Sequence, residues 1–377
     1  MPEVPRALRL VFFLNGAVLS SWAPRIPAVK ADLALSDLAL GVALLGVAAG
    51  SVPTLLLTGR LLRSVPAHLL CRASALVFAA GLPLIAAAGD VVGLAVVLVL
   101  LGAASGMLDV AMNAAAVEFE RRHRVVALPG LHAAYSLGVL GGAGTGAAVA
   151  GTLPVAAHLL LVAAVLLGVL AVAWRRLPEH VPGPAGGGPG RGGVERGARP
   201  GWRLIGVALC ALLLEGLLTD WSAVLLAEEF GAPASLAGVG VVVFSGAMAV
   251  SRGLAGRVVR RTGPVVVARW AAGALVVAVP IGVAQPSAVV LVGALALAGA
   301  GCGPLFPLAL SAAGARGAVG GAAATVTAWG YLAHLGGPPL TGFAAEHLGL
   351  RPAVLVVGGL AAVVLLVLVP AGGARPG

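Results

Sequence analysis

Asp109 and Asn113 lie four residues apart in the segment SGMLDVAMNAAAVEFERR, whose first half is almost wholly apolar. Residues at this spacing share one face of a helix. An ionisable side chain at membrane depth costs about 3 kcal/mol on insertion scales, so such groups usually face a wet cavity or a partner. The pattern predicts that this helix face lines an internal cavity. A salt bridge from Asp109 to Arg60 or Arg63 is the open alternative.

The composition indicates what kind of protein positions these residues. Of the 377 residues, 60% are hydrophobic and only 10% are charged, and the mean hydropathy is +1.05. A soluble domain has about 25% charged residues. Runs such as VVGLAVVLVLLGAASGML can cross a hydrocarbon layer, which needs about 20 apolar residues. They lack the alternation of a β-barrel strand, so the sequence predicts an all-α polytopic membrane protein.

Apolar blocks between charged or Pro/Gly breaks predict twelve transmembrane helices in two pseudo-symmetric six-helix bundles. The expected spans are 7–28, 38–58, 68–88, 91–115, 129–151, 154–174, 203–226, 235–255, 265–285, 287–310, 318–343 and 351–370. The Gly/Pro-rich segment 175–202 is typical of a flexible linker, so the expected domains are 1–174 and 203–377. Arginines gather in alternate loops, and the positive-inside rule then places both termini in the cytoplasm.

Several function classes find no support. Lys30 is the sole lysine and lies in no phosphate-loop motif, and a pyridoxal Schiff base also needs a lysine. The net charge of +10 reflects cytoplasmic arginines, because no stacking platform or basic stripe for nucleic acid accompanies it. Cys71, Cys210 and Cys302 stand singly in apolar sequence, so we expect no disulfide framework, metal or cofactor.

The two halves repeat with one offset of 197 residues, from 59 to 256 and from 102 to 299. GRLLRS at 59–64 recurs as GRVVRRTG at 256–263, and GAASGMLDVAMNAAA at 102–116 aligns with GAGCGPLFPLALSAA at 299–313. AYSLGVLGGAGTG in the fifth span has a partner in YLAHLGGPPLTG in the eleventh. Duplicated halves around a midplane site are the architecture of an alternating-access transporter.

GRLLRS and GRVVRRTG resemble degraded copies of the loop motif G-x-L-x-D-R-x-G-R-R of the major facilitator superfamily. Arg63 and Arg260 stand at or near the place of its usual aspartate. FFLNGAVLSSWAPRIP, LDVAMN, HAAYSLG, EGLLTDWSAVLL and GCGPLFPLALS resemble the fucose–proton symporter branch and related bacterial inner-membrane permeases. The resemblance implies that Asp109 accepts a proton and that Asn113 contacts substrate. The branch's acidic residue in the first span is Ala23 here, so its carboxylate pair is incomplete.

Four further ionisable residues fall inside the expected spans. Glu215 lies about 18 Å from the cytoplasmic start of its span, at 1.5 Å per residue, and is the second candidate for a titrating group. Asp220 is expected nearer the outer mouth, as gate or interface. Arg25 either snorkels to the outer interface or attracts an anionic substrate. Arg252 either anchors its span or pairs with an acid across the two halves.

Histidines and tyrosines occupy related places in the fifth and eleventh spans, where they either relay protons, bind a hydroxylated ligand or only pack. The cavity candidates are Asn15, Trp22, Arg25, Asn113, His132, Tyr135, Asp220, Phe306, Tyr331 and His334. The gate candidates are Arg60, Arg63, Arg252, Arg257 and Arg260.

The sequence thus predicts a secondary transporter, not an enzyme, in the bacterial cytoplasmic membrane. It is expected to be a monomer that moves a small-molecule substrate, first a sugar-like or small polar metabolite, with coupling to protons and without nucleic acid. Efflux of drugs or metabolites by the same fold is the alternative. A membrane-embedded transferase and a non-transporting sensor remain as other classes.

Overall fold

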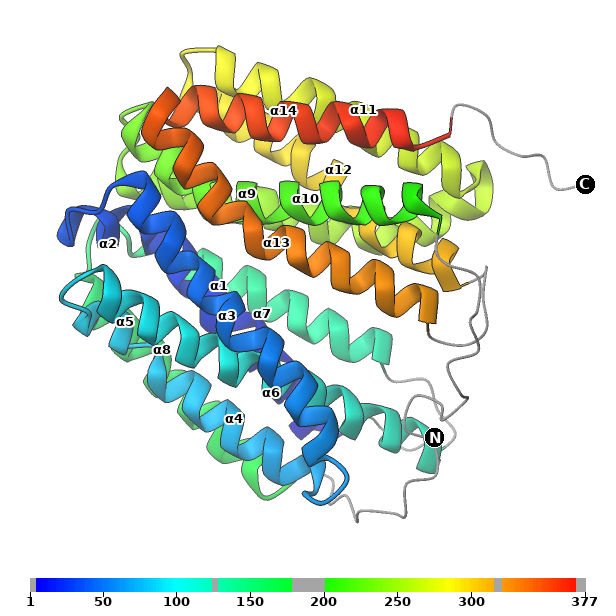
Figure 1. The fold of residues 1–377 in the computed structure, drawn as a ribbon. Coiled ribbons are helices and arrows are strands. Elements are labelled where there is room, and N and C mark those ends of the chain that lie inside the picture. The colour runs from blue at the N-terminus through cyan, green and yellow to red at the C-terminus, as the bar shows by residue number, and fades with distance from the viewer. Residues whose placement is uncertain (1–4, 124–127, 178–200, 315–320, 371–377) are drawn as a thin grey trace, which may run out of the picture. The chain divides into compact units, whose positions relative to one another are not determined.

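The computed structural model describes residues 5–123, 128–177, 201–314 and 321–370, and the regular elements in these ranges are helices (Figure 1). The helices are α1 (Arg6–Trp22), the 3-10 turn η1 (Ala23–Arg25), α2 (Ile26–Asp32), α3 (Asp37–Leu61), α4 (Ala67–Gly81), α5 (Leu84–Ala87), α6 (Val91–His123), α7 (Leu128–Ala148), α8 (Val155–Trp174), α9 (Trp202–Glu228), α10 (Ala234–Thr262), α11 (Pro264–Ala284), α12 (Ala288–Gly314), α13 (Gly321–Leu348) and α14 (Leu350–Leu368).

The chain divides into two compact units, one of residues 1–35 and 42–186 and one of residues 36–41 and 187–377. The first unit holds α1 to α8, apart from the start of α3, and the second holds α9 to α14. All twelve expected spans coincide with helical segments, if α1 to α2 and α4 with α5 each count as one. Among the described residues, nine of these segments are long and apolar enough to cross a membrane, and the 15-residue α4 is a shorter apolar helix.

Two helices extend well past their expected ends. α6 continues to His123 and α10 continues to Thr262. The segment GRVVRRT, expected as a loop motif, is therefore helical in the second unit, which corrects that expectation. α10 contains no proline and ends just before Gly263. The φ of this glycine is 89°, a conformation that glycine adopts more readily than other residues.

Glycines bring α3 and α6 into close backbone contact. A Cβ added to Gly102 would collide with the carbonyl group of Val47, and one added to Gly106 would lie 2.7 Å from the carbonyl oxygen of Ser51. Small residues at such crossings let membrane helices approach closely.

The same contact recurs between α10 and α12 in the second unit. A Cβ on Gly299 would collide with the carbonyl group of Phe244, and one on Gly303 would lie 2.9 Å from the carbonyl oxygen of Met248. Each of these four residues lies 197 positions after its counterpart in the first unit. The sequence repeat is therefore also a repeat of helix packing.

A third glycine row joins α7 to α1. Gly138, Gly142 and Gly146 are spaced by one helical turn and face successive carbonyl groups of residues 13–21. The helices pack so closely that a Cβ at any of the three glycines would meet α1 backbone. The glycine-rich pattern of the fifth span thus serves close packing within the first unit.

Candidate functional site

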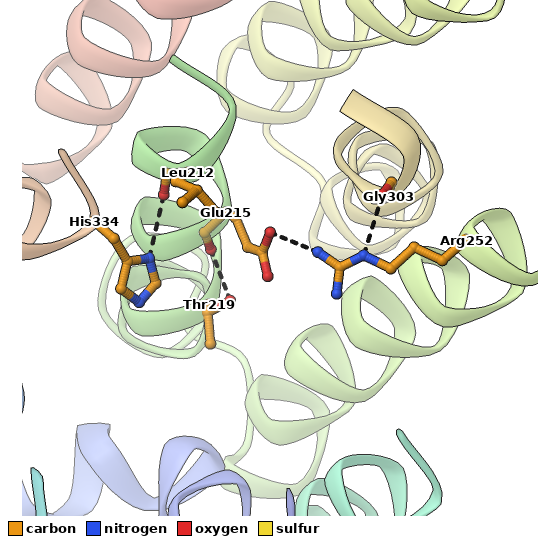
Figure 2. Close-up of polar contacts among 6 residues, drawn as sticks. All are labelled: Leu212, Glu215, Thr219, Arg252, Gly303 and His334. Atoms are coloured by element: carbon orange, nitrogen blue, oxygen red, sulfur yellow. Dashed lines mark hydrogen bonds and ion pairs between the residues drawn. The ribbon is translucent and has the colours of Figure 1, made fainter. Parts of the chain in front are cut away.

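One face of α9 gathers polar groups in the middle of the second unit. Leu212, Glu215, Gly216, Thr219 and Asp220 are spaced by three, four, seven and eight residues, which places them on one side of the helix. The helix turns this side toward α10, α12 and α13, which pack against it. Figure 2 shows Leu212, Glu215 and Thr219 with their partners. The face is the candidate functional site of this unit.

Glu215 forms a salt bridge with Arg252 of α10. The Nη2–Oε2 distance is 2.8 Å, and the two side chains are 18% and 38% exposed, Glu215 being the more buried (Figure 2). Arg252 also donates from Nε to the carbonyl oxygen of Gly303 on α12, at 3.1 Å. The guanidinium group therefore ties three helices together. The expected partner across the two halves was wrong, because the acid lies in the same unit.

His334 of α13 lies flat against α9 at a glycine. Its Nδ1 is 3.2 Å from the carbonyl oxygen of Leu212, and a Cβ on Gly216 would come within 2.8 Å of that same nitrogen (Figure 2). A carbonyl oxygen can only accept, so Nδ1 carries the hydrogen and Nε2 is left as the acceptor of the neutral ring. Gly216 therefore provides the notch that seats the imidazole ring.

Asp220 lies one helical turn beyond Gly216 and is half-buried. It interacts electrostatically with His334. Thr219, its neighbour, donates its hydroxyl hydrogen to the carbonyl oxygen of Glu215 at 2.7 Å, and so bonds within its own helix. The structure therefore brings together Glu215, Asp220, Arg252 and His334 around one helix.

The first unit holds a smaller polar group on α6. Asn113 donates from Nδ2 to the backbone oxygen of Asp109 at 2.8 Å and to its carboxylate Oδ1 at 3.3 Å. Asp109 interacts electrostatically with His132 of α7. In the described part of the chain, neither Arg60 nor Arg63 forms a salt bridge with Asp109. The alternative that Asp109 pairs with Arg60 or Arg63 is therefore wrong for this structure.

His132 meets an aromatic ring on the first helix. Its ring packs edge-on to Phe12, with the ring centroids 5.4 Å apart. Tyr135, one turn along, has an exposed side chain. The side chain of Tyr331 lies outside the described part of the structure, so its role stays a prediction.

Arg25 is buried, with only 3% of its surface exposed. Nη1 donates to the carbonyl oxygen of Val149 at 3.0 Å and Nη2 to that of Leu153 at 2.7 Å, just beyond the end of α7. A snorkelling side chain would reach water, so that interpretation was wrong. Both terminal nitrogens of Arg25 already donate to these backbone carbonyl groups, so few donors remain for an anionic substrate.

The remaining cavity candidates differ in environment. Trp22 is 3% exposed and belongs to the packed core of the first unit. Asn15 is 7% exposed, and its Oδ1 has no hydrogen-bond donor among the described residues. Phe306 is half-buried near Gly330 of α13. An unpaired buried amide oxygen is costly, so Asn15 is the most informative of the three.

The other gate candidates are exposed. Arg60 ends α3 and Arg63 follows it, while Arg257 and Arg260 lie on the last turns of α10. Within the described ranges none of these four makes a salt bridge or a side-chain hydrogen bond. Their gating role stays a prediction.

Sequence reasoning missed two features of these sites. The notch at Gly216 and the carbonyl acceptor at Gly303 are backbone features that no residue type signals. His158 of α8 was also missed, although a lone histidine in the apolar run HLLLVAAVLLGVLAVAW could have drawn attention. It is 2% exposed, and its ring nitrogens have no hydrogen-bond partner among the described residues. The described residues also contain no cluster suited to a metal ion.

Comparison with known proteins identifies the family. The sequence model of the Major Facilitator Superfamily matches residues 8–279. The chain belongs to this superfamily. It is 33% identical over 368 residues to the uncharacterized transporter y4wD of Sinorhizobium fredii, covering 95% of this chain and 96% of that one. It is 31% identical over 344 residues to an uncharacterized MFS-type transporter of Yersinia pestis, covering 90% and 88%.

Solved structures of the superfamily share the fold. The nucleoside transporter NupG aligns with a TM-score of 0.74 at 14% identity, covering 96% of this chain and 97% of that one. A bacterial homologue of the lysosomal transporter Spinster, inward-facing and unoccupied, aligns with a TM-score of 0.74 at 16% identity, covering 96% and 95%. This protein is therefore a multi-pass membrane transporter that acts on a small-molecule substrate. The narrower resemblance to the fucose–proton symporter branch stays a prediction.

Proposed function

We propose that this protein is a proton-coupled secondary transporter of a sugar-like or other small polar solute. The observation that carries the proposal is Asp109, a half-buried carboxylate within the membrane-spanning segment Val91–Ala116. The side-chain amide of Asn113 donates a hydrogen bond to it, and no arginine or lysine bridges it among the described residues. A charge in such a place is costly unless it is paired or neutralised. Protonation removes that cost.

The other polar groups have assigned roles in this proposal. Asn113 keeps the Asp109 carboxylate oriented and contacts substrate. Asn15 offers its unpaired Oδ1 to a donor such as a solute hydroxyl. Glu215 was the second titrating candidate, but it forms a salt bridge with the guanidinium group of Arg252 at 2.8 Å. We therefore assign Glu215 and Arg252 to an ion pair that holds α9 and α10 together.

The whole-molecule part of the proposal follows from the sequence. Domains 1–174 and 203–377, joined by the linker 175–202, give the substrate alternating access to the two sides of the membrane. The protein functions as a monomer in the bacterial cytoplasmic membrane with both termini in the cytoplasm. The arginine distribution supports this orientation.

Counterflow in proteoliposomes tests the proposal. A thermal-shift screen of sugars, polyols, nucleosides and amino acids on the purified protein selects the solute, which is then followed with a radiolabel. We expect uptake that accelerates with an inward proton gradient. Asp109→Asn should abolish gradient-driven uptake and retain exchange, whereas the control Glu229→Gln, exposed at the end of α9, should retain both. Unchanged gradient-driven uptake in Asp109→Asn would refute the assignment.

A further inference from the structure

We propose that Asp220 and His334 together bind the coupling proton of the second unit. This deepens the proposed function and rests on it. It also moves the proton from Glu215, the carboxylate favoured by depth alone, to a pair that sequence analysis placed among the cavity candidates.

The His334 ring has a single free nitrogen. Nδ1 faces the carbonyl oxygen of Leu212 at 3.2 Å and so carries the hydrogen. The ring lies in the notch at Gly216, where a side chain on α9 would displace it. Figure 2 shows Nε2 on the side of the ring away from Leu212. A proton that arrives on this ring therefore binds at Nε2.

Asp220 lies on the same face of α9 as the seat of this ring. Leu212 is one helical turn before Gly216 and Asp220 is one turn after it. Asp220 also interacts electrostatically with His334.

Other charged groups around α9 are already engaged. Arg252 of α10 bridges Glu215 and the carbonyl oxygen of Gly303. Arg351 of α14 donates to carbonyl groups at the end of α11. α12 carries no Asp, Glu, Lys, Arg or His, and its Cys302 is a buried thiol. Among the described residues, Asp220 therefore has a histidine neighbour but no arginine bridge.

The two carboxylates differ in what protonation costs. A proton on Glu215 would leave the Arg252 guanidinium group without its counter-charge, and breaking a partly buried pair from one side is destabilising. A proton on Asp220 neutralises its carboxylate and leaves no arginine without a salt-bridge partner. His334 accepts the proton at Nε2 to become imidazolium and then donates it to an Asp220 oxygen. The step yields a neutral acid and a neutral imidazole.

The first unit also contains an aspartate that interacts with a histidine. Asp109 interacts electrostatically with His132 of α7, the fifth helical segment of its half. His334 belongs to α13, the fifth segment of the other half, in the aligned part of the sequence repeat. The two aspartates do not correspond in the repeat, because Asp109 lies on α6, the fourth segment of its half, and Asp220 lies on α9, the first.

Infrared difference spectroscopy of the full-length protein in lipid tests the assignment without a known solute. Acid-minus-neutral spectra should show the C=O band of protonated carboxyl groups. Asp220→Asn should remove part of this band, and adding Asp109→Asn should remove most of the remainder. Glu215→Gln should leave the band unchanged, because the Glu215 carboxylate is held in the salt bridge with Arg252 and is not expected to contribute to it. His334→Gln should retain the band but shift its titration midpoint.

Two outcomes would overturn the inference. One is a band lost in Glu215→Gln but unchanged in Asp220→Asn, and the other is an unshifted midpoint in His334→Gln. If Asp220→Asn fails to fold, Asp220→Glu keeps a carboxyl group and should move the band instead of removing it. If counterflow is driven by protons but the carboxyl band is unchanged in Asp220→Asn, the assignment to Asp220 and His334 is refuted and the proposed function stands. An Asp220-dependent band without any proton-driven counterflow would instead refute the proposed function.

Discussion

Three arginines bond to the carbonyl ends of helices instead of to acids. Arg25 caps the segment after α7, Arg351 caps α11, and Arg269 donates to the carbonyl oxygens of Val369 and Pro370, just after α14. The final carbonyl groups of a helix lack partners within it and carry partial negative charge. Each guanidinium group is therefore satisfied without a carboxylate. This explains how Arg25 and Arg351 can lie on the face where positive charge is otherwise scarce.

The cap formed by Arg25 can be tested by substitution. Arg25→Met leaves the carbonyl oxygens of Val149 and Leu153 without their donor, and hydrogen bonds to charged groups contribute about 1.5–3 kcal/mol each. We expect a clearly lower Tm of the protein in detergent. Arg25→Lys should rescue only partly, because lysine lacks the planar fork. The exposed control Arg261→Gln should leave Tm unchanged. An unchanged Tm in Arg25→Met would restore the snorkelling interpretation.

The ion pair between Glu215 and Arg252 predicts strong non-additivity. Either Glu215→Gln or Arg252→Gln leaves one half-buried charge without its partner. Each should lower the free energy of unfolding by an amount between the roughly 1 kcal/mol of an exposed pair and the roughly 3–5 kcal/mol of a buried one. The double variant removes both charges and should be more stable than at least one single variant. Thermal unfolding of the four proteins measures the coupling; purely additive losses would contradict a direct pair.

Close glycine contacts decide how the helices pack at the scale of elements. The rows on α6, α7 and α12 bring neighbouring helices to backbone contact, and two of them recur at the same offset. Membrane helices lack a hydrophobic driving force between them, so packing and close approach take its place. Other glycines of the same helices face open space, which gives matched controls.

Alanine substitution should separate the two kinds of glycine. Gly138→Ala and Gly299→Ala place a Cβ against the backbone of Phe13 and Phe244, so each should lower Tm and expression. Gly144→Ala and Gly293→Ala meet nothing within 4 Å and should stabilise their helices by up to about 1 kcal/mol. Parallel melting curves of the four variants check this. Equal effects within each helix would show that the close contacts contribute little.

At the scale of the whole molecule, duplication explains why the same features appear twice. In the described residues, each unit has six helical segments and close glycine contacts at corresponding positions. A repeated unit is the design on which alternating access depends. The orientation of these units in the membrane is a prediction from the arginine distribution.

Topology reporters test that orientation. Alkaline phosphatase fused after Gly89 should be active, because the loop between the third and fourth spans is expected outside. The same reporter fused within the linker 175–202 should be inactive, while a green fluorescent protein placed there should fluoresce. Reversed signals at both sites would invert the proposed topology.

The amino-acid sequence alone determined the fold class, the helix ranges and the repeat. These features depend on the length of apolar segments, on proline and glycine breaks and on the number of arginines in each loop. All of them are local, so they can be recognised without knowing which helices pack together. It also singled out Asp109, Glu215, Asp220 and His334, because an ionisable residue in an apolar run is conspicuous. Helix ends were less certain, and α10 ran past its expected end because no breaker precedes Gly263.

Only the tertiary structure decided which of these residues meet. Glu215 and Arg252 lie 37 residues apart and Arg25 lies 124 residues from Val149, and nothing in a helical pattern specifies such partners. The seat of His334 depends on a missing side chain at Gly216, and the second bond of Arg252 depends on a backbone oxygen. These contacts depend on which helices are neighbours and how closely they approach. The partners of the charged residues could therefore be identified only from the structure, whereas the charged residues themselves are visible in the sequence.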